Sequence, residues 1–340
     1  MALTINHQTN DISATSGSIT IDGSALGGGG ATAVSGTNLI GGTNAGGGSS
    51  SSVFNVVLGV DAAVQIVGAD MCTVVGYEAG RFSTEGDFNT CVGMQSGNRY
   101  GNHGSYNVAV GAMAMGYGAT ASSSCSYNTT VGYSALLLID NGQSNTALGS
   151  QVLPALTTGD YNSGVGDSAL AGVTTGARNT GAGFLAGYTT TTGSNNSSLG
   201  QFATPSSATA SNEVTLGNTS ISALRCQVTS ITSLSDARDK TDIEPLQAGL
   251  DFVEQLKPVS FNWNMRDGAK VGVEDTGFIA QDLQQVQQDT GLTIPDLVYA
   301  ENPEKLEAAY GKLVPVLVQA VKDLSNKVNE LEAKLNQNGV

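Results

Sequence analysis

The sequence predicts a mainly β repeat shaft followed by an α+β domain that ends in a coiled-coil helix. Three observations lead to this fold class. A short phrase recurs between residues 38 and 217, 45 of the 340 residues are glycine, and charged residues become dense only after residue 230. We divide the chain into an N-terminal segment, 1–37, a shaft, 38–220, and a C-terminal domain, 221–340.

The repeated phrase has the pattern of a short strand that closes on a glycine. Eleven copies, from NLIGG to EVTLG, recur every 17 residues, apart from one interval of 18 and one of 21. The residue before the glycine is apolar in ten copies and Thr, Ser or Val usually stands two places earlier, which is the period-two pattern of a β-strand. The closing glycines are Gly42, Gly59, Gly76, Gly93, Gly111, Gly132, Gly149, Gly166, Gly183, Gly200 and Gly217.

Two other positions of the repeat are also regular. Asparagine opens nine copies, and asparagine tolerates turn geometry and forms amide ladders where equal rungs stack. A small residue usually follows the glycine by three places, which indicates tight inner packing, and the glycine itself permits the bend. The asparagines are Asn38, Asn55, Asn89, Asn107, Asn128, Asn145, Asn162, Asn179 and Asn196. The small residues are Ala62, Ala79, Ser96, Ala114, Ala135, Ala169, Ala186 and Ala203.

A single repeat of this length cannot bury an apolar face, so the repeats must stack. Two architectures satisfy this requirement: a β-solenoid of one chain, or an intertwined trimeric β-prism. With one rung per repeat, either shaft would be about 50 Å long. We expect identical chains to associate, because each is too thin to shelter its own apolar residues.

The two irregular intervals mark insertions between Tyr100 and Ser126. Insertions into a regular shaft project as loops, and loops that contain Tyr and His are suitable contact surfaces. A tolerated insertion without a partner is an equally good interpretation.

Composition excludes several classes of function. Up to residue 230 there are 4 arginines and 11 acidic residues (−7), and beyond it 10 basic and 18 acidic residues (−8), which together give the net charge of −15. Such a chain repels a phosphate backbone, so we expect no nucleic-acid binding. No apolar run is long enough for a membrane span, and no signal peptide is apparent. Two histidines and four cysteines without CxxC spacing predict no metal site and no cofactor, and the cysteines are expected to be small buried apolar residues.

The C-terminal domain alternates between helical and strand patterns. Apolar residues recur at helical spacing from Leu246 to Leu256 and stop before Pro258. VSFNWN alternates as a strand, and FIAQDLQQVQQDTG predicts a helix that ends at Gly291.

The final segment predicts a coiled coil over 311–336. We place the helix start near Gly311, with Pro315 in the first turn, where the lost hydrogen bond matters least. Val at a and Leu at d favour two strands, whereas fibre shafts of this kind are more often threefold, and we favour the trimer. The a residues are Val314, Val321, Val328 and Leu335, and the d residues are Leu317, Leu324 and Leu331.

Three stretches of this region resemble one known family. They are the run from Ser235 to Ile243, GFIAQDLQ at 277–284, and AYGKLVPVLVQAVKDL at 309–324. Together they resemble the C-terminal intramolecular chaperone, or self-cleaving assembly domain, of phage tail spikes and fibres such as the endosialidases. The resemblance spans 231–340. The upstream repeats resemble phage fibre shafts and, more loosely, the heads of trimeric adhesins.

The resemblance implies that this domain trimerises, holds three shafts in register while they fold, and then cuts itself off before the motif serine. On this chain the scissile bond is Leu234–Ser235, with Ser235 as nucleophile and Lys240 as its base. Arg238 is expected to favour the neutral form of Lys240 or to hold the fold, and Asp236 to orient the backbone. Without the downstream stretches, the same run would be interpreted as a solvated, charged linker.

These features predict a homotrimeric phage tail fibre that is assembled in the host cytoplasm and resides in the virion tail. Residues 1–37 would attach to a tail or baseplate protein, and the shaft or its loops would contact a host-surface glycan or protein. Apart from single-turnover self-cleavage, we expect no activity on an external substrate.

Two alternatives remain. One is a glycan-degrading tail spike, in which two of the acids Asp61, Glu78, Glu85 and Asp87 would form a carboxylate pair across subunits. The other is a trimeric bacterial surface adhesin, which the missing signal peptide and membrane anchor disfavour.

Overall fold

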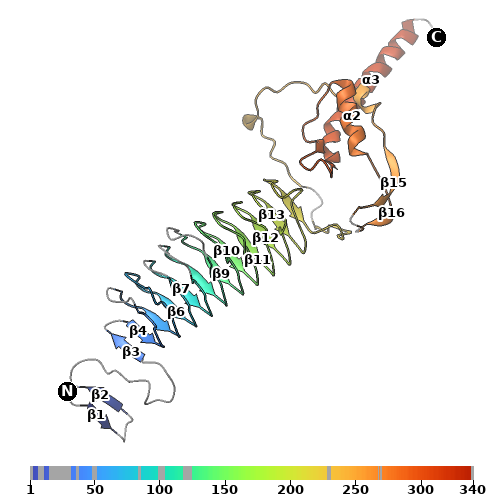
Figure 1. The fold of residues 1–340 in the computed structure, drawn as a ribbon. Coiled ribbons are helices and arrows are strands. Elements are labelled where there is room, and N and C mark those ends of the chain that lie inside the picture. The colour runs from blue at the N-terminus through green and yellow to red at the C-terminus, as the bar shows by residue number, and fades with distance from the viewer. Residues whose placement is uncertain are drawn as a thin grey trace. The chain divides into compact units, whose positions relative to one another are not determined.

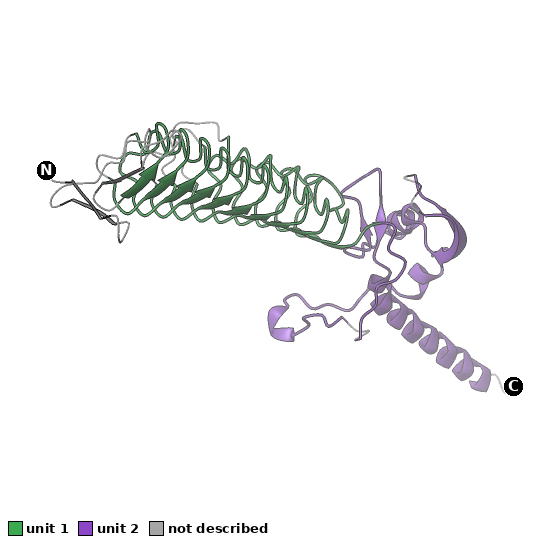
Figure 2. Cartoon of the chain, turned by 90° about the horizontal axis from the view of Figure 1, so that it is seen from below, with its two compact units in different colours: residues 1–218 green, residues 219–340 purple. Residues whose placement is uncertain are grey.

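The computed structural model describes strands within residues 1–37 and then residues 38–47, 52–82, 86–98, 104–117, 125–227, 231–266, 268 and 270–337. The chain divides into two compact units, residues 1–218 and 219–340 (Figure 2). We call them the shaft unit and the C-terminal unit.

The shaft unit is a β-solenoid in which each turn of the chain contributes one short strand (Figure 1). Neighbouring strands from β4 to β14 are parallel and follow chain order. Their register places equivalent positions of successive repeats opposite each other; for example, Thr146 of one strand pairs with Ser163 of the next. The strands are β4 (Asn38–Gly41), β5 (Val56–Leu58), β6 (Thr73–Val75), β7 (Thr90–Val92), β8 (Val108–Val110), β9 (Thr129–Val131), β10 (Thr146–Leu148), β11 (Ser163–Val165), β12 (Thr180–Ala182), β13 (Ser197–Leu199) and β14 (Val214–Leu216).

Three further strands precede the repeats. β1 (Leu3–Asn6) and β2 (Asp11–Ala14) pair antiparallel with each other, and β3 (Thr32–Ser35) pairs antiparallel with β4. The expected insertion loops fall largely on residues 99–103 and 118–124, which lie outside the described residues.

The predicted fold class is confirmed, and all eleven repeat phrases form strands. Of the two architectures left open, the structure has the β-solenoid, because every parallel pairing joins successive turns of one chain.

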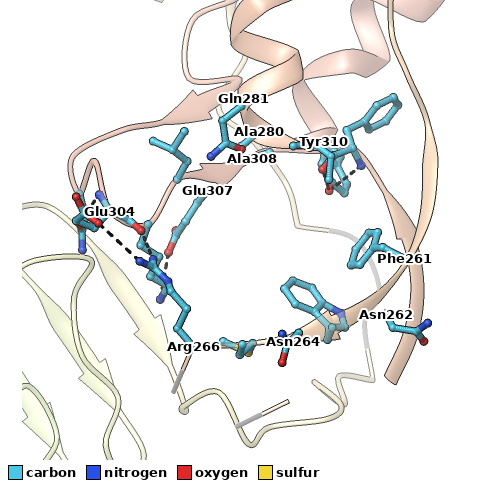
Figure 3. A pocket seen from close by; sticks show the side chains of 17 residues that line it. Phe261, Asn262, Asn264, Arg266, Ala280, Gln281, Glu304, Glu307, Ala308 and Tyr310 are labelled. Atoms are coloured by element: carbon cyan, nitrogen blue, oxygen red, sulfur yellow. Dashed lines mark hydrogen bonds and ion pairs between the residues drawn. The ribbon is translucent and has the colours of Figure 1, made fainter. Parts of the chain in front are cut away.

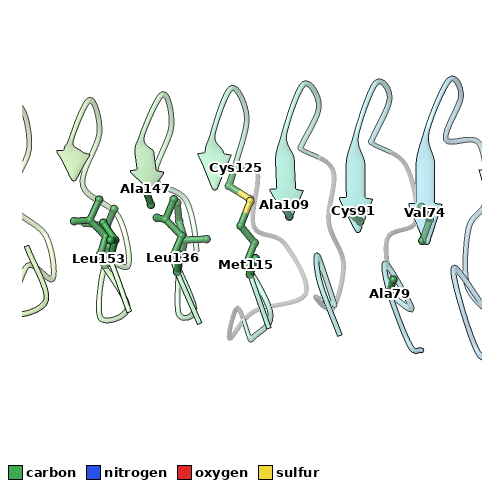
Figure 4. Packing of buried hydrophobic residues seen from close by; sticks show 14 of the residues in the cluster. Val74, Ala79, Cys91, Ala109, Met115, Cys125, Leu136, Ala147 and Leu153 are labelled. Carbon is green, nitrogen blue, oxygen red and sulfur yellow. The ribbon is translucent and has the colours of Figure 1, made fainter. Parts of the chain in front are cut away.

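The interior of the solenoid stays filled although its side chains vary in size. In early turns the larger of the two inward side chains is on the strand. Val74, the middle residue of β6, points inward, whereas the buried residue four places after the repeat glycine is Gly80. In later turns the sizes reverse, since Leu136 fills the turn position while Ala147 is the inward strand residue (Figure 4). Compensation of this kind keeps close packing without a fixed residue at either position.

The expectation that one chain cannot shelter its apolar residues is wrong for this interior. Ile66, Leu136 and Leu156 are fully buried within a single chain, because stacking places the turns above and below each of them. The residue that ends each strand points outward instead and is half-buried or exposed. We call these residues the outer column: Leu58, Val75, Val92, Val110, Val131, Leu148, Val165, Ala182, Leu199 and Leu216.

The repeat asparagines form the expected ladder inside the solenoid. Asn162 is buried; its backbone N–H and its side-chain amide both donate to Asn145 Oδ1, at 2.8 and 3.1 Å, and its amide also donates to the carbonyl of Gly176 at 2.9 Å. Gly111 has a φ of +130°, and a Cβ there would lie 2.5 Å from the carbonyl oxygen of Gly132 on the next turn. Gly111 thus permits both the bend and the close approach of turns.

The C-terminal unit packs three helices around a small core. Its helices are α1 (Leu250–Val253), α2 (Ala280–Thr290) and α3 (Leu313–Gln337), with 3-10 turns η1 (Ala237–Asp239) and η2 (Tyr310–Lys312). Two antiparallel pairs complete it: β15 (Val259–Asn264) with β16 (Val271–Gly277), and β17 (Val298–Tyr299) with β18 (Glu307–Ala308). The core contains Phe252, Leu283, Leu297, Leu313 and Val316.

Most of the predicted elements of this unit are confirmed. VSFNWN forms β15, α2 ends at Gly291 in the left-handed conformation (φ 64°), and Pro315 is the third residue of α3. The helix expected over Leu246–Leu256 is shorter, because Gly249 has a non-helical backbone and α1 begins only after it.

Candidate functional site

The candidate self-cleavage segment is an exposed loop of the C-terminal unit. Residues 231–247 are all exposed, and Leu234, on the acyl side of the expected scissile bond, is 100% exposed. The only regular element in it is η1, a single turn that begins directly after Asp236. The bond is therefore accessible to water.

The turn brings the two expected reacting groups together. Lys240 follows η1, and its Nζ lies 2.6 Å from Ser235 Oγ and 3.3 Å from the backbone carbonyl of Ser235. A nucleophile and a base within hydrogen-bond distance are the arrangement that a serine–lysine pair requires. Five residues separate Ser235 from Lys240 in sequence, and η1 closes this distance.

Asp236 and Arg238 support the turn. Asp236 caps η1 by accepting the backbone N–H of Arg238 at 2.9 Å, and its carboxylate also forms an ion pair with the guanidinium of Arg238 at 2.5 Å. These bonds from Arg238 hold the pKa of Asp236 below its ordinary value, and the carboxylate raises the pKa of Arg238. The Arg238 charge is thus directed at Asp236.

Reaction needs one condition that this exposed loop does not supply. A lysine accepts a proton only in its neutral form, which burial or an uncompensated neighbouring cation favours. Here Lys240 is exposed and the nearby cation is paired. The geometry therefore places the two expected reacting groups together in an exposed loop.

One further hydroxyl, which no sequence pattern singled out, lies at the carbonyl of the expected scissile bond. Ser233 Oγ donates to the carbonyl oxygen of Leu234 at 3.4 Å. A donor at this oxygen is suited to stabilise the negative charge that develops during attack. No spacing pattern distinguishes Ser233 from the many other serines of the chain.

The C-terminal unit also contains a hollow of about 1000 Å³ between the β15–β16 hairpin and the β17–β18 segment (Figure 3). Phe261, Trp263 and Tyr310 line it, and the Tyr310 hydroxyl bonds both the N–H and the carbonyl of Phe278 at 3.1 Å. Arg266 crosses to the opposite wall, where it bonds the backbone carbonyl of Glu304. Aromatic walls around an open hollow are typical of a surface that receives another chain.

The acids considered for glycan cleavage hold the turns of the solenoid together. Asp61 accepts from the Asn44 amide at 2.9 Å, Glu78 accepts from the Gln95 amide at 2.8 Å, and Asp87 accepts the backbone N–H of Asp70 at 2.8 Å. Glu85 lies outside the described residues. The three described acids thus make hydrogen bonds between turns of the solenoid.

Metal-binding clusters and membrane-spanning helices are both absent from the described part of the chain. It contains no cluster of three or more His, Cys, Asp or Glu side chains arranged to bind a metal ion. None of its helices combines the length and the apolar character that crossing a bilayer demands. Cys72, Cys91 and Cys125 are buried as expected, whereas Cys226 is exposed, since it follows the last solenoid turn.

Comparison with known proteins identifies the C-terminal region. Residues 235–298 match the model of the family described as chaperone of endosialidase, and the match begins at Ser235. The chain carries an endosialidase-type chaperone domain. This confirms the resemblance seen in the sequence.

Two curated relatives are phage tail fibre proteins. The long tail fiber protein Gp37 of Enterobacteria phage K3 and that of Enterobacteria phage T2 are each 33% identical to this chain over 105 residues, which is 30% of the chain. The match covers 8% of the first relative and 7% of the second, so this chain spans a small part of the relatives' length. No solved structure matches the chain.

Proposed function

We propose that the chain is a homotrimeric phage tail fibre whose chaperone domain assembles three copies. The observation that carries this proposal is the succession of a β-solenoid shaft and an endosialidase-type chaperone domain in a chain similar to phage tail fibre proteins. Residues 1–37 attach the fibre to a virion tail or baseplate protein, and the shaft contacts a host-surface glycan or protein.

The exposed apolar stripe of α3 supports self-association. All seven a and d residues of the heptad are exposed, from Val314 (58%) to Leu335 (54%). The adjoining face of the helix is already used at its N-terminal end, because Leu313, Val316 and Ala320 are buried. A helix with a second, unpartnered apolar stripe gains most from pairing with its own copies.

The outer column of the shaft supports the same conclusion. It places one aliphatic side chain on every rung of a ten-rung sheet face. Monomeric proteins rarely expose a continuous apolar strip along their whole length. Register among three such shafts is hard to set, because slipped pairings bury nearly the same surface, and a terminal trimeric domain solves this.

Self-cleavage completes the proposed function. Lys240, in its neutral form, takes the proton of Ser235 Oγ, and the oxygen attacks the carbonyl carbon of Leu234. The C–N bond breaks, the proton passes to the released amine of Ser235, and water then hydrolyses the ester to free the carboxylate of Leu234. Assembly provides the burial that the exposed loop lacks, so cleavage follows trimerisation and leaves the shaft kinetically trapped.

The test is to express the full chain beside Ser235→Ala and Lys240→Ala and to measure intact mass, oligomeric state and binding to a panel of enterobacterial strains. We expect the wild type to be cut after Leu234, both variants to remain intact, and all three to form trimers that bind cells. Equal full-length mass in all three would remove self-cleavage from the proposal. A monomeric wild type that binds no strain would remove the fibre itself.

The glycan-degrading spike stays the alternative, and release of short sugars from host polysaccharide would favour it.

A further inference from the structure

One position of the repeat forms a row of large side chains on the outside of the solenoid. It directly precedes the ladder position, which is Cys72 in one turn and asparagine in the neighbouring turns, and from Phe54 to Arg178 its residues have a left-handed backbone with φ between 55° and 62°. Because the turns are in register, these side chains lie one above the other along the shaft. We call them the ring row: Phe54, Met71, Phe88, Tyr106, Tyr127, Ser144, Tyr161 and Arg178.

The middle of the ring row is a continuous stack. Phe88 lies on Tyr106 with ring centroids 4.9 Å apart and 5° between planes, and Tyr106 lies on Tyr127 at 5.1 Å and 3°. On the far side of Ser144, the Arg178 guanidinium covers the Tyr161 ring at 6.0 Å. Tyr127 and Tyr161 therefore each have one ring face covered by a neighbour on the side away from Ser144.

Ser144 leaves this stack one ring short. Two rungs separate Tyr127 from Tyr161, which corresponds to about 10 Å between ring centres. A ring placed midway would stack on both tyrosines at about 5 Å, within the range that paired rings prefer. The exposures agree with an open space: Tyr127 and Tyr161 are each 59% exposed, against 43% for Phe88 and 48% for Tyr106 inside the stack.

We propose that this slot, with Tyr127 and Tyr161 as walls and Ser144 as floor, binds one neutral pyranose ring of a host-surface polysaccharide. The inference rests on the proposed function and assigns it a contact site and a ligand class. A pyranose fits because its two faces carry C–H groups, which pack on aromatic rings, while its hydroxyl groups lie around the rim.

The polar groups at the slot favour a sugar over an aromatic side chain of a protein. Within the described part of the chain, neither the Ser144 hydroxyl nor the side-chain amide of Gln143 has a hydrogen-bond partner. A sugar offers hydroxyl groups to both, whereas an apolar ring would leave them unpaired.

Charge selects among sugars. The Asp160 carboxylate accepts the backbone N–H of Gln143 at 2.7 Å, which places a negative charge beside the slot. The chain up to residue 230 is acidic as well. Both features disfavour sialic and uronic acids, and the Arg178 guanidinium lies behind the Tyr161 ring, on the face away from the slot. A neutral hexose is therefore the sugar that we expect at this surface.

The decisive variant fills the slot with the protein's own ring. Ser144 has a φ of 55°, close to the 61° of Tyr127 and the 59° of Tyr161, so Ser144→Tyr is compatible with the backbone. We would compare the full chain with Ser144→Tyr, Tyr127→Ala and Tyr161→Ala on an array of neutral hexopyranose oligosaccharides, sialylated oligosaccharides and tyrosine-containing peptides. Tyr133→Ala is the matched control, because Tyr133 is a comparably exposed tyrosine (51%) outside the ring row.

We expect the wild type to bind at least one neutral oligosaccharide and each of the three slot variants to bind it at least about tenfold more weakly. Tyr133→Ala should match the wild type, and Ser144→Tyr should melt no lower than it. The inference is overturned if no neutral sugar binds, if sialylated sugars or peptides bind in preference, or if Ser144→Tyr binds as the wild type does. Should Ser144→Tyr fail to fold, the two alanine variants, checked by circular dichroism, decide the outcome.

Cell binding separates this inference from the proposed function. Wild type and Ser144→Tyr that bind enterobacterial cells equally would overturn the slot and leave the fibre intact. A wild type that binds the array sugars but no cells would leave the slot intact and count against the attachment role.

Discussion

Asp323 on α3 accepts the backbone N–H of Leu250, the first residue of α1, at 3.0 Å. Seventy-three residues separate the two in sequence. The same carboxylate accepts the side-chain amide of Gln319 at 2.8 Å, so a long helix supplies the cap that the short one lacks in its own sequence. A carboxylate at a helix start also interacts favourably with the helix dipole.

This contact makes the stability of the C-terminal unit depend on pH. The N–H of Leu250, and then the amide of Gln319, hold the pKa of Asp323 below its ordinary value. A carboxylate with a lowered pKa in the folded state stabilises that state fully above about pH 4, and the contribution is lost as pH falls through the folded-state pKa. We expect Asp323→Asn to lower the denaturation midpoint near neutral pH and to approach the wild type in strong acid.

Trp263 provides the measurement, because it is the single tryptophan of the chain and lies in this unit. Urea unfolding followed by its fluorescence at several pH values gives the difference between variants. Glu330→Gln, at an exposed position of the same helix, is the control and should follow the wild type throughout. A constant difference between Asp323→Asn and the wild type at every pH would contradict the assignment.

Thr130 is a buried hydroxyl without a partner. It is the inward residue of β9, fully buried in the column that contains Ala109 and Ala147, and its Oγ1 makes no hydrogen bond. Thr130→Val keeps the shape and removes the unpaired group, so we expect a gain of about 1 kcal/mol in the free energy of unfolding. Chemical denaturation followed by circular dichroism measures it. Thr129→Val, at an exposed position of the same strand, should change little, and equal effects of the two changes would show that burial is not the cause.

The fold of the shaft was predictable because its signal is repeated. Ten intervals, eight of them of 17 residues, specify a rung, and the register follows once the repeat glycines and most of the repeat asparagines must stack on their equivalents. The choice between a single-chain solenoid and an intertwined prism was not predictable, since both place the same residues inside. The structure has the solenoid because its parallel pairs join successive turns of one chain. Its interior is filled by pairs such as Leu136 with Ala147, whose sizes compensate across a turn and leave no fixed pattern at either position.

The candidate site was predictable only in part. The resemblance named Ser235 and Lys240, and the turn η1 that brings them to 2.6 Å depends on a local cap, Asp236 on Arg238, which has a recognisable sequence pattern. Two contacts could not be predicted from the sequence: Ser233 with the Leu234 carbonyl, and Asp323 with the N–H of Leu250. Both depend on how the backbone is placed in space, which no local sequence pattern indicates.

Cys72 occupies the ladder position where the neighbouring turns have asparagine. Its backbone N–H still donates to Asn55 Oδ1 at 2.7 Å, and its thiol bonds the Gly86 carbonyl at 3.3 Å, but a thiol gives the next turn no amide oxygen. We expect Cys72→Asn to supply that acceptor to Asn89 and to raise the free energy of unfolding by about 1 kcal/mol.

Cys91→Asn is the matched opposite change. Cys91 is the buried, inward residue of β7, and burial raises the pKa of its thiol to about 12. An asparagine there has no ladder to join, so it should destabilise the shaft by more than about 1 kcal/mol. Thermal melts of both variants decide the matter: if the two changes act in the same direction, the ladder is not what stabilises this position.

The α3 stripe gives the sharpest test of assembly. Leu324 is a d residue and 52% exposed in the single chain, so Leu324→Lys costs the isolated fold little but places a charge at the centre of any helix–helix seam. We expect light scattering to give the wild type three times the mass of its cut chain, and Leu324→Lys to dissociate. Asn326→Lys adds the same charge at an exposed position off the stripe and should remain trimeric.

Because the proposed self-cleavage needs the burial that assembly provides, Leu324→Lys should also stay full length. A Leu324→Lys chain that dissociates yet is still cut after Leu234 would show that the exposed loop reacts by itself.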